Sequence, residues 1–207
     1  MVEIQRQAER VLFLPGASGD REFWKPVADR VQHSGDKVLL GWPGFGSNPT
    51  DPSIKSLDDL FQSVLPLIDR PVDLVAQSMG GVLAVRAALE APELVRHLVL
   101  TATSGGIDVS RFGAADWRGQ YRRDRPSAPD WFARDRSDFS PRLSEVKAPT
   151  LLIWSDADPI SPLAVGRYLV AMLPHAELVV VPDADHMFAR DRAEEIAPRI
   201  QRHLLAP

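Results

Sequence analysis

Short apolar runs alternate along this chain with longer segments in which apolar residues recur at helical spacing. The runs occupy residues 11–14, 37–40, 72–76, 98–100, 151–154 and 178–181. Runs this short, apolar on both sides of an extended chain, are typical of parallel strands that helices cover on both faces. The pattern therefore predicts a mostly parallel sheet.

The segments between these runs are predicted to be helices. They span residues 26–32, 56–68, 81–90 and 192–205, and Pro198 is expected to kink or break the last of them. Strands that alternate with helices predict an α/β fold, with right-handed crossovers placing helices on both faces of the sheet.

One stretch, which we call the 104–147 segment, interrupts this alternation. It lacks an apolar strand but carries many charges and the aromatic residues Phe112, Trp117, Tyr121, Trp131, Phe132 and Phe139. This aromatic content favours a packed insertion over disorder. We therefore predict an α/β core formed by residues 1–103 and 148–207, with a small lid formed by residues 104–147. The arginines of the lid alternate with acidic residues, so we interpret them as a solvated, ion-paired face.

Composition narrows the possible classes of function. Hydrophobic residues make up 44% of the 207 residues, enough for the core of one domain with a modest insertion. The absence of cysteine excludes disulfides, thiolate metal sites and a cysteine nucleophile. With 24 basic and 28 acidic residues the net charge is −4, which argues against a nucleic-acid partner. No apolar run approaches the ~18 residues of a membrane span, and residues 1–6 lack a signal-peptide pattern. We expect a cytoplasmic protein without a membrane partner.

A serine stands where the run at residues 72–76 leads into a predicted helix, in the sequence Ala76-Gln77-Ser78-Met79-Gly80. Small residues around a serine at such a junction are typical of a nucleophile elbow, although an ordinary helix-capping serine is the alternative. A serine hydroxyl needs a base and an orienting acid to become a nucleophile.

Candidates for both partners follow later predicted strands. His186 lies in the loop after the last strand, and Asp158 follows the strand before it. Asp156 lies in the same loop as Asp158, and periodicity does not separate the two carboxylates. Because parallel strands present their carboxyl ends at one edge of the sheet, these side chains are expected to meet there.

Five loops of this chain resemble loops of the α/β-hydrolase fold superfamily, in its serine-hydrolase branch, and they follow one another in the family's order. The resemblance covers the elbow at residues 76–80, the acid loop at 154–160, the histidine loop at 182–188, and two further loops at 14–19 and 41–47. The family pattern of the acid loop selects Asp158 over Asp156. Pro15 and Gly41 depart from the histidine and aspartate usual in the family, a pair expected to tie the last two loops together.

This resemblance implies a mechanism and the residues that perform it. Ser78 would be the nucleophile, His186 the general base and Asp158 its orienting acid, while the backbone N–H groups of Ala17 and Met79 would form the oxyanion hole. We expect a carboxylesterase that acts on a small-molecule ester through an acyl-serine, without metal or organic cofactor. Carbon–carbon bond hydrolases, thioesterases and lyases can use the same triad, and a ligand-binding protein without turnover is the alternative from another class.

Overall fold

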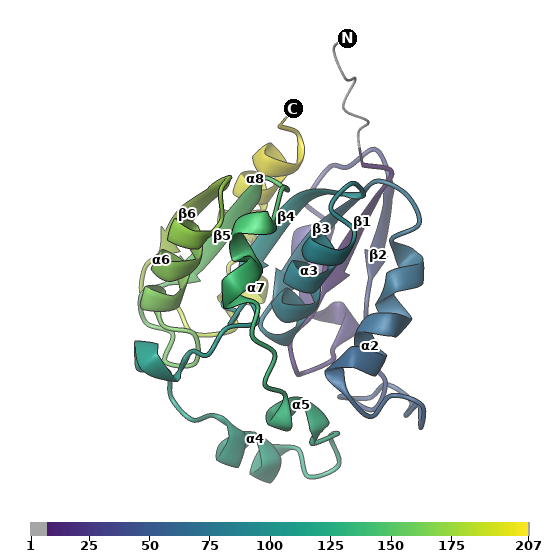
Figure 1. Ribbon diagram of the computed structural model, residues 1–207, viewed down its shortest axis with the longest axis vertical. Helices are drawn as coiled ribbons and strands as arrows, with labels where there is room; N and C mark the ends of the chain where they lie inside the picture. Colours follow the sequence, from purple (N-terminus) through teal and green to yellow (C-terminus); the bar gives the residue numbers. More distant parts are fainter. Residues whose placement is uncertain (1–7, 207) are drawn as a thin grey trace.

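The apolar runs form one parallel sheet with the strand order β2-β1-β3-β4-β5-β6 (Figure 1). The computed structural model describes residues 8–206. The strands are β1 (Arg10–Leu14), β2 (Asp36–Leu39), β3 (Val72–Gln77), β4 (Val95–Thr101), β5 (Thr150–Ser155) and β6 (Ala176–Val181). The predicted α/β fold class is confirmed. Residues 1–6, on which the expectation about a signal peptide rests, lie outside the described residues.

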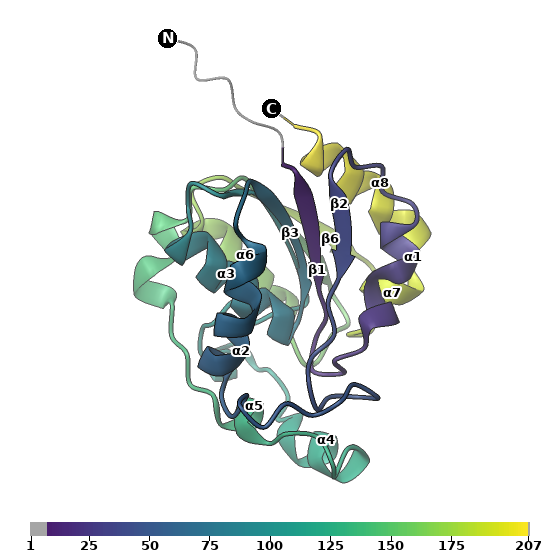
Figure 2. The same ribbon diagram turned by 90° about the vertical axis from the view of Figure 1, so that its right-hand side faces the viewer.

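Helices cover both faces of the sheet, as Figure 2 shows. One face carries α2 (Leu57–Val64), α3 (Met79–Glu90) and α6 (Leu163–Met172), and the other carries α1 (Lys25–Ala28), α7 (Phe188–Asp191) and α8 (Ala193–Leu204). Successive residues of a strand point to opposite faces. Leu12 and Leu14 therefore pack in the first of these layers, whereas Val11 and Phe13 pack in the second. Burial of both faces explains the apolar runs within the inner strands β1, β3, β4 and β5.

Several helices differ from the sequence prediction at their ends. Helix α1 ends at Ala28, and a 3-10 turn (Arg21–Trp24), capped by the Asp20 carboxylate, precedes it. A kink or a break was expected at Pro198; helix α8 continues through this residue without a break. The buried apolar face of α8, which includes Ile196 and Ile200, packs against the sheet and α1 and outweighs the hydrogen bond that proline cannot donate. Among the described residues, no helix has the length and apolarity needed to traverse a bilayer.

The 104–147 segment connects β4 to β5 and lies mainly beyond the carboxyl edge of the sheet (Figures 1 and 2). It contains α4 (Arg118–Asp124), α5 (Trp131–Arg134) and the 3-10 turns Ser110–Phe112 and Ser140–Glu145. The last turn buries Leu143 and returns the chain along the sheet toward β5. Helices α4 and α5 thus stand over the edge at which the candidate site residues were expected.

Candidate active site

Ser78 occupies a sharp turn between β3 and α3. Its backbone has φ 52° and ψ −119°, a region that non-glycine residues rarely adopt. Hydrogen bonds hold this conformation: the Ser78 N–H donates to the Thr101 carbonyl (3.1 Å), and the Thr103 hydroxyl donates to the Ser78 carbonyl (2.6 Å). Backbone strain of this kind persists only where the surrounding structure fixes it. The sharp turn raises the Ser78 side chain above the end of the strand.

Glycine at position 80 allows the turn to lie against β1. A Cβ atom there would come within 2.5 Å of the Leu14 and Pro15 carbonyl oxygens. Only a residue without a side chain lets helix α3 begin so close to the end of the neighbouring strand. Gly80 therefore sets the position of the elbow relative to the loop that follows β1.

The structure brings Ser78, His186 and Asp158 into one chain of hydrogen bonds. The Nε2 atom of His186 lies 3.1 Å from Ser78 Oγ, and its Nδ1 atom lies 2.7 Å from Asp158 Oδ2. The Asp158 side chain is fully buried, whereas His186 retains 16% exposure. Gln77, beside the elbow, donates through Nε2 to the His186 carbonyl (3.2 Å) and ties the histidine loop to β3. A hydroxyl, an imidazole and a carboxylate at these distances can transfer a proton from the serine.

The two aspartates of the acid loop have different surroundings. Asp158 Oδ1 accepts hydrogen bonds from the backbone N–H groups of Ile160 (2.8 Å) and Ser161 (3.2 Å), which turn the carboxylate inward. Asp156 is exposed, and its Oδ1 accepts from the Asp183 N–H (2.9 Å). The structure therefore places Asp158, and not Asp156, against the histidine.

Ala17 and Met79 belong to two segments that adjoin the serine. A Cβ atom at Gly16 would be 3.0 Å from Ser78 Cβ, so the loop that carries Ala17 touches the elbow. Met79 is the first residue of α3, where the helix end attracts negative charge. Within residues 8–206, neither the Ala17 N–H nor the Met79 N–H donates a hydrogen bond to another protein group.

The loops at residues 14–19 and 41–48 are tied together without the histidine–aspartate pair usual in the family. Trp42 donates through its indole Nε1 to the Pro15 carbonyl (2.9 Å) and through its backbone N–H to the Gly19 carbonyl (3.2 Å). The Asn48 amide also donates to the Gly19 carbonyl (2.6 Å). Trp42 is buried and belongs to the hydrophobic core. Sequence reasoning missed these contacts, since only the fold shows which carbonyl each side chain reaches.

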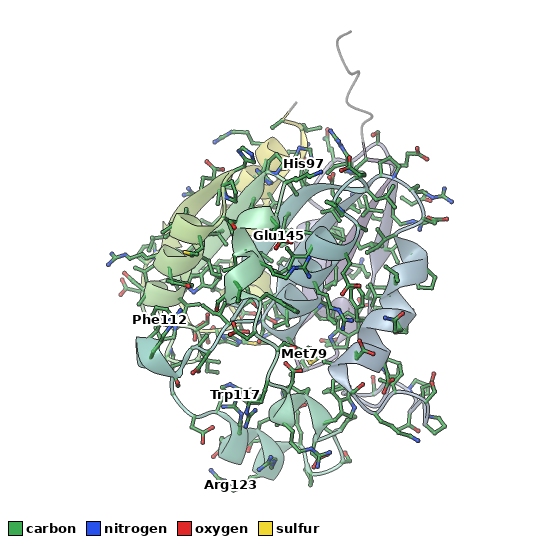
Figure 3. The ribbon with its side chains drawn as sticks, viewed as in Figure 1. Met79, His97, Phe112, Trp117, Arg123 and Glu145 are labelled. Atoms are coloured by element: carbon green, nitrogen blue, oxygen red, sulfur yellow. The ribbon has the colours of Figure 1, made fainter. Side chains whose placement is uncertain are left out.

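The 104–147 segment packs over the site through its aromatic residues. In Figure 3, Trp117 lies on the side of α4 nearer Met79, and Arg123 lies on the far side. Trp117 stacks on Phe132 with ring centroids 5.2 Å apart, and Phe45 of the core meets Trp131 edge-to-face at 5.5 Å. Arginines of the segment form surface ion pairs, namely Arg118–Asp116, Arg134–Asp130 and Arg142–Glu145. These pairs agree with the interpretation of a solvated, ion-paired face.

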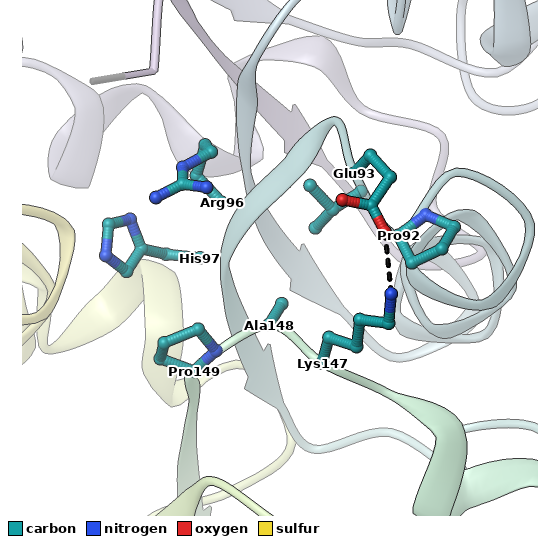
Figure 4. Close-up of a pocket in the computed structure, with 8 residues that line it drawn as sticks. Pro92, Glu93, Arg96, His97, Lys147, Ala148 and Pro149 are labelled. Atoms are coloured by element: carbon teal, nitrogen blue, oxygen red, sulfur yellow. Dashed lines mark hydrogen bonds and ion pairs between the residues drawn. The ribbon is translucent and has the colours of Figure 1, made fainter. Parts of the chain in front are cut away.

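A pocket at the opposite end of the sheet is separate from the triad (Figure 4). It is lined by Pro92, Glu93, Val95, Arg96, His97, Lys147, Ala148 and Pro149. Its charged groups include an exposed ion pair between Lys147 and Glu93 (2.6 Å). Among the described residues, no group of three or more histidine, aspartate or glutamate side chains could hold a metal ion.

Comparison with known proteins places this geometry in context. A model of the alpha/beta hydrolase family matches residues 11–199. A poly(3-hydroxyalkanoate) depolymerase of Ectopseudomonas oleovorans is 26% identical, over 94% of this chain and 83% of the relative. A 2-hydroxy-6-oxononadienedioate/2-hydroxy-6-oxononatrienedioate hydrolase of Paraburkholderia phymatum is 30% identical, over 87% of this chain and 80% of the relative.

Two solved structures share the fold. A hydrolase from Pseudomonas aeruginosa PA01 is similar with a TM-score of 0.77 at 20% identity, covering 96% of this chain and 91% of that one. A thermophilic esterase from Thermogutta terrifontis has a TM-score of 0.74 at 22% identity, covering 95% of this chain and 89% of that one. At these identities the likeness extends to the fold alone.

Proposed function

Because this chain belongs to the alpha/beta hydrolase family, we propose that it is a serine hydrolase that cleaves a small carboxylic ester through an acyl-serine intermediate. The observation that carries the proposal is the unbroken chain of hydrogen bonds from Ser78 Oγ through His186 to the buried Asp158 carboxylate. A serine that merely capped a helix would need neither partner.

In the proposed mechanism, Ser78 Oγ attacks the ester carbonyl carbon while His186 Nε2 accepts the hydroxyl proton. Asp158 keeps the other ring proton on Nδ1 and stabilises the imidazolium. The tetrahedral oxyanion is met by the N–H groups of Ala17 and Met79, each worth roughly 3–4 kcal/mol in the transition state. His186 then protonates the departing alkoxide. Water, deprotonated by the same imidazole, then attacks the acyl-serine. His186 returns this proton to Ser78 Oγ as the acid is released.

Hydrolysis of a carbon–carbon bond is the second candidate. The relative from Paraburkholderia phymatum, 30% identical to this chain, is named as a hydrolase of 2-hydroxy-6-oxononadienedioate. The fold and the triad serve ester and carbon–carbon substrates alike, so the choice depends on the substrate that the site accepts. A thioesterase, a lyase or a binding protein without turnover has no comparable observation in its favour. The prediction of a cytoplasmic enzyme without cofactor rests on the sequence.

A fluorophosphonate probe tests the nucleophile directly. Wild-type protein is expected to be labelled, and Ser78→Ala is expected to lose labelling because the attacking oxygen is gone. Ser63→Ala, on α2 and remote from the triad, is the matched control and should label like wild type. Equal labelling of Ser78→Ala and wild type would remove Ser78 from the mechanism.

A substrate panel distinguishes the two reactions. Short and long p-nitrophenyl esters and a vinylogous diketone are offered to the same preparation, and release of product is followed by absorbance. Turnover of the esters supports the esterase proposal. Cleavage of the diketone with the esters untouched would replace it with carbon–carbon bond hydrolysis.

A further inference from the structure

Tyr121 joins the 104–147 segment to the loop that forms the oxyanion hole. From helix α4, its hydroxyl donates a hydrogen bond of 2.7 Å to the backbone carbonyl of Ala17, 104 residues away in sequence. Ala17 is the residue whose N–H is proposed to stabilise the oxyanion. Tyr121 therefore contacts the backbone of a reacting-site residue without reaching the reacting atoms itself.

The neighbouring carbonyls of this loop are held by other parts of the protein. The Pro15 carbonyl accepts from the Trp42 indole, and the Gly16 carbonyl accepts from the Gly19 N–H within a tight turn (3.0 Å). The Gly19 carbonyl accepts from the Asn48 amide. The Ala17 carbonyl is instead held from the 104–147 segment. The peptide unit that carries the Ala17 N–H is thus held within the loop through the Gly16 carbonyl, and the next unit, which carries the Ala17 carbonyl, is held from α4.

The surroundings of Tyr121 keep its hydroxyl in place as a donor. Its ring meets Phe132 edge-to-face at 4.9 Å and Trp117 at 5.9 Å, and the Arg125 guanidinium lies 5.3 Å from the ring centre. Burial raises the pKa of Tyr121 to about 12. The phenol therefore stays protonated throughout the neutral range and continues to donate to Ala17.

We propose that Tyr121 is a positioning residue that couples the seating of the 104–147 segment over the site to the orientation of the Ala17 N–H. This inference rests on the proposed serine-hydrolase function. The Tyr121 bond holds the peptide unit between Ala17 and Ser18, which adjoins the unit that carries the Ala17 N–H. When α4 is seated, this neighbouring unit is fixed and limits rotation about Ala17; when α4 lifts, that restraint is lost. Since the oxyanion exists only in the transition state, the coupling acts on the chemical step more than on substrate binding.

Tyr121→Phe tests the proposal because it removes the hydroxyl and keeps the ring. Removal of an oxyanion donor costs 10²–10³ in kcat, and a donor that is loosened but present should cost less, about tenfold. We expect kcat for a p-nitrophenyl ester to fall by about tenfold, with KM changed by no more than about twofold. Tyr168→Phe, on α6, makes the same chemical change outside this contact and should behave like wild type.

The inhibition constant of a trifluoromethyl ketone distinguishes a loss of oxyanion stabilisation from a general structural effect of the substitution. The ketone forms a tetrahedral adduct with the serine and presents an oxyanion, so its inhibition constant should rise by the factor by which kcat/KM falls. A Tyr121→Phe enzyme with unchanged kcat, or with a change in KM alone, would overturn the proposal. If the proposed function itself is wrong, the outcome is different: wild-type protein neither reacts with the fluorophosphonate nor cleaves the esters.

Discussion

Asp156 and Asp158, two positions apart in the acid loop, lie in different environments. Asp158 is turned inward by the backbone N–H groups of Ile160 and Ser161 and contacts His186, whereas Asp156 stays at the surface and binds the Asp183 N–H. Side-chain chemistry is the same at both positions, so the difference arises from the direction in which the backbone presents each group. Asp158 is the one able to orient the imidazole.

Substitution at these two positions should separate them by kinetics. Asp158→Asn is expected to lower kcat for a p-nitrophenyl ester by about 10³–10⁴, because an amide facing Nδ1 favours the wrong tautomer of His186. Asp156→Asn is the matched control and should stay within about twofold of wild type, as an exposed substitution outside the triad. A larger loss for Asp156→Asn than for Asp158→Asn would reverse the assignment of the acid.

At the scale of elements, the strands could be predicted from the sequence and several helix ends could not. A buried parallel strand is mostly apolar on both faces, and that pattern is visible in residues 72–76, where Asp73 is the exception, and in residues 151–154. The 3-10 turn before α1 depends on its capping by Asp20, and the passage of α8 through Pro198 depends on packing. Local propensity contains neither.

The same limit applies to the candidate site. Ser78, Asp158 and His186 could be identified because each lies in a loop with a recognisable local pattern. The contributions of Gln77, Trp42 and Tyr121 depend on which loops meet in space. No local pattern marks a tyrosine whose partner is a carbonyl 104 residues away.

The tight approach of α3 to β1 gives a prediction about stability. Gly80→Ala would place a methyl group 2.5 Å from two backbone oxygens, and the strain is expected to cost about 1–3 kcal/mol in the free energy of unfolding. Gly119→Ala is the control: in exposed helix α4 a Cβ meets only the Arg123 guanidinium at 3.6 Å, and alanine should add about 0.5–1 kcal/mol. Urea denaturation followed by circular dichroism measures both. An unchanged Gly80→Ala midpoint would contradict the close contact.

At the scale of the whole molecule, the two ends of the sheet hold different buried carboxylates. The triad lies at the carboxyl edge, whereas Asp73 is buried toward the amino edge between His33 Nε2 (3.0 Å) and His97 Nδ1 (2.8 Å). In Figure 3, His97 lies near the upper end of the sheet and Met79 near its lower end. Burial opposes the ionisation of Asp73, but the hydrogen bonds from both histidines outweigh it and hold its pKa below the ordinary value. The bond to Asp73 in turn raises the pKa of His33.

These shifts give a pH dependence with a definite sign. A lowered Asp73 pKa stabilises the fold above pH 3.8, and the contribution is lost as pH falls through the lowered value. A raised His33 pKa contributes fully below pH 6.5 and is lost as pH rises through the raised value. Asp73→Asn should therefore lower the free energy of unfolding by about 3–5 kcal/mol near pH 5.5, the usual effect of breaking a buried pair, and by less near pH 9.

Urea unfolding at the two pH values measures this difference. The control is Asp69→Asn: the Arg70 guanidinium lowers the pKa of the exposed Asp69 to about 2, so that carboxylate is ionised at both pH values. Its effect on stability should be the same at each. A cost of Asp73→Asn that did not change with pH would show that the charged His33–Asp73 pair adds nothing beyond the neutral hydrogen bond.

The loop at residues 14–19 is held by the indole of Trp42 and the amide of Asn48. This choice of side chains affects how the protein tolerates acid. Neither group gains or loses a proton in the range where enzymes work. A histidine–aspartate pair changes its charge on acidification because the imidazole gains a proton, whereas the indole and the amide keep the same hydrogen bonds. The position of this loop beside the elbow therefore does not depend on the protonation state of the side chains that hold it.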